Sequence, residues 1–392
     1  MVIIMENNRI QYVDRFGTDC VKWDGLEKKY GSKDMLSMWV ADMDFRCPEC
    51  VHEALRTYME CGAYGYDMLS RRFNTAFAKW EKERHGYEVD SHWLRYCTGV
   101  VQAFYWCVNC MTQEGDHVLV LPPVYYPFFN AVEETDRKLV ESDLIWDGET
   151  YTMNYQDIED KIVANDVKML LFCSPHNPVG RVWKREELEK LVEICDRHDV
   201  IIVSDEIHQD FVFPGSVHTS MGLIRQNKTV VLSAPSKTFN LAGMTTAMAI
   251  IPDEELRSQW DLLSKRIHVS EGNSFGYLAG EAAYLHGGEW VDSLLDLLFS
   301  NYTLLRNRLL ENLPLLKVAP LEGTYLMWVD FGAYIKKEEM QEFFEKTCKI
   351  ALDYGDWFHG HADTFVRFNL ATKPEFIEKA ANVIIEALSH DQ

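Results

Sequence analysis

Short apolar runs alternate with amphipathic stretches through the middle of the chain, between residues 93 and 252. The runs predict five strands, at 118–121, 168–173, 200–204, 229–232 and 246–251. After the second run, apolar residues at i, i+3, i+4 and i+7 predict one buried face of a helix: Leu188, Leu191, Val192 and Cys195. Strands that are apolar throughout and alternate with helices are typical of a mainly parallel sheet covered on both faces. This part of the chain is therefore predicted to be a large α/β domain.

The pattern changes after residue 287, where the strict alternation of strand and helix ends. Long helical periods at 289–313 and 374–388 enclose strand-like runs at 323–330 and 364–370. This arrangement favours a second, smaller domain of the α+β class.

The first 50 residues show no clear helical period and predict an irregular arm that lies against the rest of the protein. A helix is expected from Pro48 to Cys61, because proline is tolerated in a first helical turn, and a turn follows at 62–67. The expected division is an arm with part of the small domain, a large domain and a small C-terminal domain: 1–47, 48–287 and 288–392.

Composition and charge exclude several classes of partner. Hydrophobic residues make up 47% of the 392 residues and charged residues 26%, as in compact globular proteins. The net charge of -22 argues against nucleic acid or an anionic membrane as partner, so a small anionic ligand needs a local positive pocket. Residues 1–10 contain Glu6 and too short an apolar run for a secretory signal or a membrane span. We therefore expect a cytoplasmic protein.

Ten cysteines are scattered through predicted helices and strands, which favours reduced thiols over disulfides. Two pairs have the Cys-x-x-Cys spacing found in zinc sites: Cys47 with Cys50, and Cys107 with Cys110. The second pair lies in an apolar helical run, where cysteine serves as a small apolar residue. No metal site is predicted.

Polar residues follow three successive predicted strands. Asn177 follows the strand at 168–173, Asp205 and His208 follow the strand at 200–204, and Lys237 follows the strand at 229–232. The carboxyl ends of parallel strands share one edge, where ligands bind, so these side chains are expected to meet. A lysine beside a serine is suited to act as an amine nucleophile next to an anion site.

A predicted strand also ends at Gly99, where a helix begins whose free N–H groups can receive a phosphate. Each of these residues has a structural alternative when it is taken singly. Lys237 could be a surface lysine, Asn177 a turn former and Asp205 a helix cap. His208 could be a packed histidine, and Gly99 could be an ordinary turn. Their placement at one sheet edge weakens these separate alternatives.

These residues resemble the fold-type I pyridoxal 5'-phosphate (PLP) enzymes, the aspartate aminotransferase superfamily. Within it, five segments resemble the MalY/PatB group of carbon–sulfur β-lyases: WVADMDF at 39–45, PPVYYPF at 122–128, SPHNPVGRVW at 174–183, SDEIH at 204–208 and SKTFNLAG at 236–243. The resemblance runs from about Asp14 to Pro374. It implies a fold-type I PLP transferase fold with PLP as cofactor.

The resemblance also implies roles for single residues. Lys237 would hold PLP covalently and, once released, move the Cα proton of the substrate. Asp205 would pair with the pyridine nitrogen, Asn177 would donate to the ring oxygen and Tyr125 would stack on the ring. The other cofactor-binding candidates are His208, the backbone of Gly99, Val100 and Val101, and the hydroxyls of Ser233 and Ser236.

Substrate binding and assembly follow from the same resemblance. Arg367 matches the arginine that holds the substrate α-carboxylate, and Val40 and Asn177 are the other substrate-binding candidates. Tyr66 matches a tyrosine that reaches the phosphate of the neighbouring subunit, which implies a homodimer with shared sites. Tyr125, or Tyr66 of the partner subunit, could also assist the leaving group.

Departures from the wider superfamily bear on the reaction. Many aminotransferases have arginine where this chain has Thr245, and tyrosine where it has His208. Both departures resemble the β-lyase group. A third, local departure, WFHGHA at 357–362, bears on the mouth of the substrate pocket. We therefore predict α,β-elimination from cystathionine or related cysteine S-conjugates, giving pyruvate, ammonia and a thiol. An aminotransferase, or a lyase with a second regulatory binding role, is the alternative, and the choice among sulfur substrates is open at this point.

Overall fold

The computed structural model of this protein describes residues 10–269 and 271–389. Its largest sheet has seven strands, in the order β2 (Leu94–Cys97), β10 (Ala247–Ile250), β9 (Thr229–Ser233), β8 (Ile201–Asp205), β7 (Val167–Cys173), β3 (His117–Val120) and β4 (Lys138–Glu141). β10 runs antiparallel to both of its neighbours, and every other pairing in this sheet is parallel. The mainly parallel sheet is confirmed, and each of the five predicted strands matches an observed strand to within one residue at either end.

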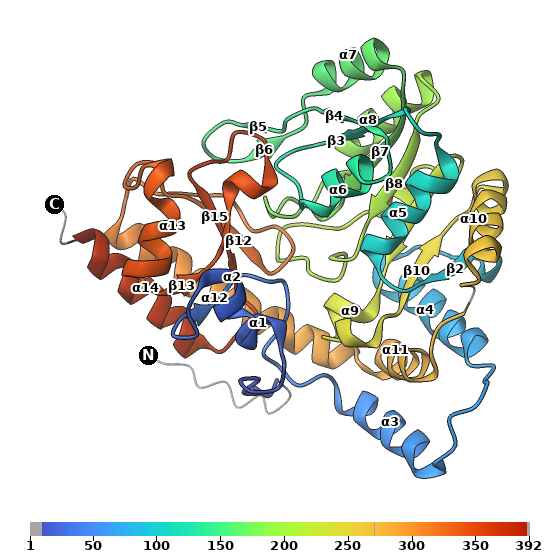
Figure 1. Ribbon diagram of the computed structural model, residues 1–392, viewed down its shortest axis with the longest axis horizontal. Helices are drawn as coiled ribbons and strands as arrows, with labels where there is room; N and C mark the ends of the chain where they lie inside the picture. The colour runs from blue at the N-terminus through green and yellow to red at the C-terminus, as the bar shows by residue number, and fades with distance from the viewer. Residues whose placement is uncertain (1–9, 270, 390–392) are drawn as a thin grey trace.

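Helices cover both faces of this sheet (Figure 1). Along β7, Met169 and Leu171 belong to one core, and Leu170 and Phe172 belong to the other, because successive strand residues point to opposite faces. This burial on both faces explains the continuous apolar runs of the sequence. The helices of this region are α3 (Glu49–Cys61), α4 (Ser70–His85), α5 (Val100–Met111), α6 (Pro127–Glu133), α7 (Tyr155–Asn165), α8 (Arg185–Arg197), α9 (Pro235–Thr238), α10 (Glu254–Ile267) and α11 (Ser274–His286).

A second, antiparallel sheet has the strand order β11 (Lys317–Val318), β12 (Leu326–Asp330), β15 (Phe365–Asn369) and β14 (Asp353–Tyr354). The predicted long helices are α12 (Gly288–Asn312) and α14 (Pro374–Ser389), which pack against each other. The smaller α+β unit is therefore present, and the residue limits given above for the domains remain a prediction. Three further short elements are the strands β5 (Ile145–Trp146) and β6 (Tyr151–Thr152), which pair as a hairpin, and the single turn of helix α13 (Met340–Glu342).

The N-terminal arm contains two helices that the sequence pattern does not reveal, α1 (Val21–Asp24) and α2 (Leu26–Tyr30). Helices this short are unstable alone and carry no periodic signal. Tertiary contacts hold them: the fully buried Nζ of Lys22 lies 2.8 Å from Oδ2 of Asp44, and Nε1 of Trp23 donates to Oδ1 of the same carboxylate at 2.8 Å. β1 (Leu36–Ser37) pairs in parallel with β13 (Ile350–Ala351), which joins the arm to the small domain.

The expected helix at 48–61 is confirmed as α3. No described helix is long and apolar enough to cross a membrane. The carboxyl ends of β7, β8 and β9 lie side by side, because these three strands are parallel neighbours. Asp205 at the end of β8, and the segments after β7 and β9 that carry Asn177 and Lys237, therefore lie at one edge of the sheet.

Candidate active site

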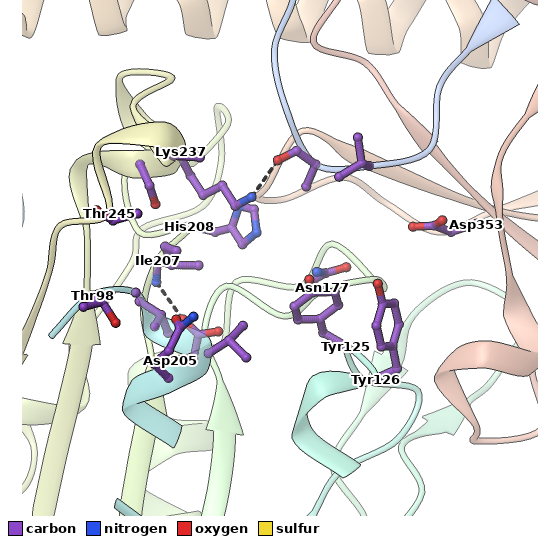
Figure 2. A pocket seen from close by; sticks show the side chains of 18 of the residues that line it. Thr98, Tyr125, Tyr126, Asn177, Asp205, Ile207, His208, Lys237, Thr245 and Asp353 are labelled. Carbon is purple, nitrogen blue, oxygen red and sulfur yellow. Dashed lines mark hydrogen bonds between the residues drawn. The ribbon is translucent and has the colours of Figure 1, made fainter. Parts of the chain in front are cut away.

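A cavity of about 260 Å³ lies at this edge of the large sheet, where the arm and the small domain meet it. Figure 2 shows side chains from all three regions pointing into it. The predicted site residues that line the cavity are Val40, Gly99, Val100, Val101, Tyr125, Asn177, Asp205, His208, Ser236, Lys237 and Arg367. The structure thus brings most of the predicted site together, although Val40 and Arg367 are more than 300 residues apart in the chain.

Lys237 lies on α9, which begins with Pro235 in its first turn. Its Nζ donates a hydrogen bond to the carbonyl oxygen of Ala41 in the arm, at 2.6 Å. Burial lowers the pKa of Lys237, and the charge of Arg367 adds to this effect, while Asp42 and Asp205 oppose it. A lowered pKa leaves more of the amine neutral at physiological pH, which is the form that acts as nucleophile or base.

A buried carboxylate fixes α9 from the side away from the cavity. Oγ1 of Thr238 donates to Oδ2 of Asp210 at 2.6 Å. Oδ1 of Asp210 accepts from Nε1 of Trp80 and also contacts Nε2 of His85, each at 3.0 Å. The residue next to Lys237 is therefore tied to helix α4 through one fully hydrogen-bonded carboxylate.

Ser233 does not line the cavity, in contrast to Ser236. Its hydroxyl accepts a hydrogen bond from Nε2 of Gln209 at 3.0 Å, and the same amide donates to Oε1 of Glu81 at 2.5 Å. Of the two serines named as phosphate ligands, the structure therefore leaves only Ser236 facing the site. Ser233 instead ties the end of β9 to the buried carboxyl of helix α4.

Asp205 stands at the end of β8, buried, with Oδ1 accepting from the backbone N–H of Ile207 at 3.0 Å. Burial raises the pKa of Asp205 to about 7; the Ile207 N–H and Lys237 oppose this, and Glu206 adds to it. A buried carboxyl with a raised pKa is stabilised as an anion when a cation binds beside it. The site is thus suited to a protonated ring nitrogen.

His208 is buried against aromatic rings, with its ring centroid 5.7 Å from that of Tyr325 and 6.0 Å from that of Phe211. Burial lowers its pKa well below 6.5, and the positive charges of Lys237 and Arg367 act in the same direction. The imidazole is therefore neutral. Its Nδ1 accepts or donates no hydrogen bond within the described residues.

The N-terminus of α5 forms the anion-binding end of the cavity. Gly99 is the N-cap and no side chain caps the first N–H groups, so those of the first turn are free for a ligand. Ser236, Thr245 and Thr98 add hydroxyl-bearing side chains to the same cavity. Free N–H groups together with hydroxyls are suited to a phosphate.

Arg367 lies on β15 and is almost fully buried. Its Nη1 donates to Oδ1 of Asn177 at 2.8 Å, its Nη2 donates to the carbonyl oxygen of Trp39 at 3.3 Å, and Nη2 also pairs with the carboxylate of Asp353. Nε has no partner within the described residues. A guanidinium held this firmly presents a fixed fork to a carboxylate.

Tyr125 lies beside Asn177, whose carbonyl oxygen accepts its backbone N–H at 3.1 Å. Its ring is tilted against that of Tyr126, with centroids 4.9 Å apart, and burial raises the pKa of its hydroxyl. The Tyr125 phenol is therefore a proton donor and not an anion at physiological pH.

Tyr66 lies away from this cavity and is fully exposed. Tyr66 is predicted to reach the phosphate in the site of a neighbouring subunit, and this role remains a prediction. The segment WFHGHA also stays outside: Trp357, His359 and His361 do not line the cavity. Nδ1 of His359 instead pairs with Oε1 of Glu141 at 2.6 Å. The segment nevertheless supports the cavity wall from behind, because the ring of Phe358 lies 5.0 Å from Cζ of Arg367 and its centroid lies 6.4 Å from that of Tyr126.

Ten lining residues were not among the predicted site residues, and they include Thr98, Tyr126 and Asp353. The first two are direct neighbours of predicted residues, Gly99 and Tyr125, so the motifs themselves could have pointed to them. Asp353 follows no motif, and only the pairing of β14 with β15 brings it to the cavity. Within the described residues, no group of three or more His, Cys, Asp or Glu side chains could hold a metal ion.

Comparison with known proteins places the chain in a family. A family model described as aminotransferase class I and II matches residues 33–384. The chain belongs to the class I and II aminotransferase family. This match and the sheet order confirm the predicted fold.

Individual members of this family are similar over nearly the full chain. Cystathionine β-lyase PatB of Bacillus subtilis is 36% identical, over 96% of this chain and 98% of that protein. The crystal structure of a PLP-bound putative aminotransferase from Clostridium difficile has a TM-score of 0.94 and 39% identity, covering 97% of this chain and 99% of the other. A PLP-bound C–S lyase from Staphylococcus hominis has a TM-score of 0.90 and 30% identity, covering 96% and 97%. The resemblance to the MalY/PatB group is thereby confirmed.

Proposed function

We propose that this protein is a PLP-dependent carbon–sulfur β-lyase, which cleaves cystathionine or related cysteine S-conjugates to pyruvate, ammonia and a thiol. The observation that carries the proposal is the single cavity that joins an amine, a buried carboxylate, an uncapped helix start and a buried guanidinium. The naming of PatB as a cystathionine β-lyase and of the Staphylococcus hominis structure as a C–S lyase supports the same reaction.

The residues present fit PLP part by part. The uncapped start of α5 and Ser236 suit its phosphate, Asp205 suits its protonated ring nitrogen, and the amine of Lys237 suits its aldehyde. The buried carboxyl of Asp205 has a raised pKa although the charge of Lys237 opposes the rise, and it forms no ion pair with any described residue. A protonated ring nitrogen bound beside it would stabilise its anion. When bound, PLP supplies an electron sink for the carbanion that forms when the Cα proton leaves.

The protein's own residues then perform the remaining tasks. Arg367 binds the substrate α-carboxylate and so fixes the orientation of Cα. Lys237, whose pKa is lowered, takes the Cα proton as a general base. Tyr125, a neutral phenol, can donate a proton to the departing sulfur, although a thiolate leaves with little assistance.

A lyase is favoured over an aminotransferase by two residues on the cavity wall. Thr245 stands where many aminotransferases have an arginine, and the neutral His208 stands where they have a tyrosine. The experiment is incubation of the holoenzyme with cystathionine in the absence of any keto acid. Pyruvate and a thiol formed in equal amounts support elimination. A reaction that needs a keto-acid acceptor would refute the lyase and support an aminotransferase.

We also propose a homodimer. Large apolar side chains are exposed at the end of α3 and in the segment that leads to α4, at Met59, Tyr64, Tyr66 and Met68. A second subunit that covered this segment would bury them and would bring Tyr66 to a neighbouring site. Light scattering of the purified protein tests the mass, and a monomer that retains full activity would contradict the shared site.

A cytoplasmic location is supported by the cysteines. All ten are free thiols, including both Cys-x-x-Cys pairs. Free thiols are the rule in a reducing compartment.

A further inference from the structure

The cavity wall carries four charged side chains, and the proposed reaction uses three of them. Lys237 and Asp205 are assigned to the cofactor, and Arg367 is assigned to the substrate α-carboxylate. The fourth, Asp353, lines the same cavity and has no assigned task. A charge kept at a cavity wall acts on every ligand that enters it.

Asp353 is held in a fixed position beside Arg367. The two residues are direct cross-strand partners in the pairing of β14 with β15, and Oδ2 of Asp353 pairs with Nη2 of Arg367. The residue is 3% exposed. Its Oδ1 accepts no hydrogen bond from the described residues.

Lys29 is the second cation near Asp353, and it stands outside the cavity. Its Nζ lies 3.5 Å from Oδ1 of Asp353, between the rings of Trp39 and Trp357 at 4.2 and 4.3 Å from their centroids. Lys29 is not among the lining residues, so the charge that faces a ligand at this point of the wall is the carboxylate.

We propose that Asp353 determines the charge that the site accepts on the sulfur substituent. This inference rests on the proposed function. Cysteine S-conjugates whose substituent carries no net negative charge are accepted, and these include cystathionine with its zwitterionic substituent. Those whose substituent has a carboxylate as its only charged group are rejected. The reason is that the substrate α-carboxylate occupies Arg367, so a second anionic group meets Asp353 without a free cation on the wall.

The volume of the cavity limits the distance between Asp353 and a charged substituent, and this distance determines how strongly Asp353 changes the affinity. A sphere of about 260 Å³ is roughly 8 Å across, so a charged substituent cannot lie much farther than this from Asp353. Two unit charges at roughly this separation, in an effective dielectric of about 20, change binding by roughly 30-fold. The preference for a cationic over an anionic substituent should therefore be on the order of a thousandfold, because the two effects have opposite sign.

The test uses three ligands that differ only in their end group: 3-(2-trimethylammonioethylthio)propanoate, 3-(3,3-dimethylbutylthio)propanoate and 3-(2-carboxyethylthio)propanoate. Each has a carboxylate for Arg367 but no primary amine that could react with the aldehyde of PLP, so neither elimination nor transamination can consume it. Dissociation constants are measured by calorimetry on the holoenzyme. The wild type should bind the ammonium ligand most tightly and the dicarboxylate most weakly.

Asp353→Asn should reduce this ratio at least tenfold, since asparagine keeps an oxygen for Arg367 and removes the charge. The matched control is Glu345→Gln, which removes a nearby carboxylate that acts on Lys29 but does not line the cavity. It should leave the ratio unchanged. The corresponding substrates, S-(2-aminoethyl)-L-cysteine and S-carboxymethyl-L-cysteine, should show the same shift in kcat/KM.

Two results would overturn the proposal. One is a wild-type protein that binds the three ligands equally well, which can be tested even if the variant does not fold. The other is an Asp353→Asn variant that weakens all three ligands by the same factor, since Asp353 would then only position Arg367. A failure of the proposed function is distinguishable, because it appears as absence of pyruvate from cystathionine while the ligand ratio is still measurable.

Discussion

Glu81, on helix α4, should make the stability of the protein depend on pH. The side chain is fully buried, and burial raises its pKa from the ordinary 4.5 to about 7; Asp210 and Glu206 add to this, while His85 and the hydrogen bond from Gln209 oppose it. The unfolded chain releases this proton near pH 4.5, and the folded protein releases it only near pH 7. The folded state therefore binds more protons in between, so the contribution of Glu81 to stability is fully present below pH 4.5 and is lost as pH rises through 7.

The rise of the Glu81 pKa corresponds to about 3 kcal/mol of unfolding free energy, since each tenfold change of an equilibrium constant is 1.36 kcal/mol. Glu81→Gln cannot ionise, and its amide oxygen can still accept from Gln209. Its unfolding free energy relative to the wild type should therefore rise by about 3 kcal/mol between pH 4.5 and pH 8.

The assay is urea unfolding of both proteins at a series of pH values. Glu83→Gln is the matched control, because Glu83 lies on the same helix but is exposed. Its curve should run parallel to that of the wild type. A Glu81→Gln curve that also runs parallel would show that Glu81 is already ionised in the folded protein at low pH and would refute the reasoning.

Two further predictions concern the catalytic side chains. Thr238→Val removes the hydroxyl that donates to Asp210. A hydrogen bond to a charged group is worth about 1.5–3 kcal/mol, so this variant should lower kcat/KM for cystathionine on the order of tenfold. Thr238→Ser keeps the hydroxyl and should restore kcat/KM. Equal rates for the valine and serine variants would show that this contact does not position Lys237. Arg367→Lys replaces the guanidinium fork by a single ammonium and should raise KM on the order of tenfold, with a smaller effect on kcat. An unchanged KM in steady-state kinetics would contradict the assignment of the α-carboxylate to Arg367.

The sequence predicted the large domain well because its strands are buried on both faces. Continuous apolar runs such as 168–173 are then unavoidable, and the turn after each strand leaves the sheet at a known edge. Asn177, Asp205 and Lys237 could be placed together on this ground alone.

Features that depend on tertiary contacts could not be predicted in this way. Helices α1 and α2 are held by Lys22 and Trp23 against Asp44, not by their own periodicity. Asp353 reaches the cavity through the register of β14 on β15, which no local pattern encodes. The position of Ser233 was also open in the sequence, because a residue one step from the end of a strand can face the site or the core.

In the proposed mechanism, Lys237 holds the cofactor covalently and serves as the catalytic base. This is tested by reduction of the PLP-loaded protein with sodium borohydride, followed by mass mapping of the modified peptide. We expect one modified residue, Lys237, within 233–243, and no modification of this segment in Lys237→Ala. Modification of another lysine in the wild-type protein, or none, would contradict it.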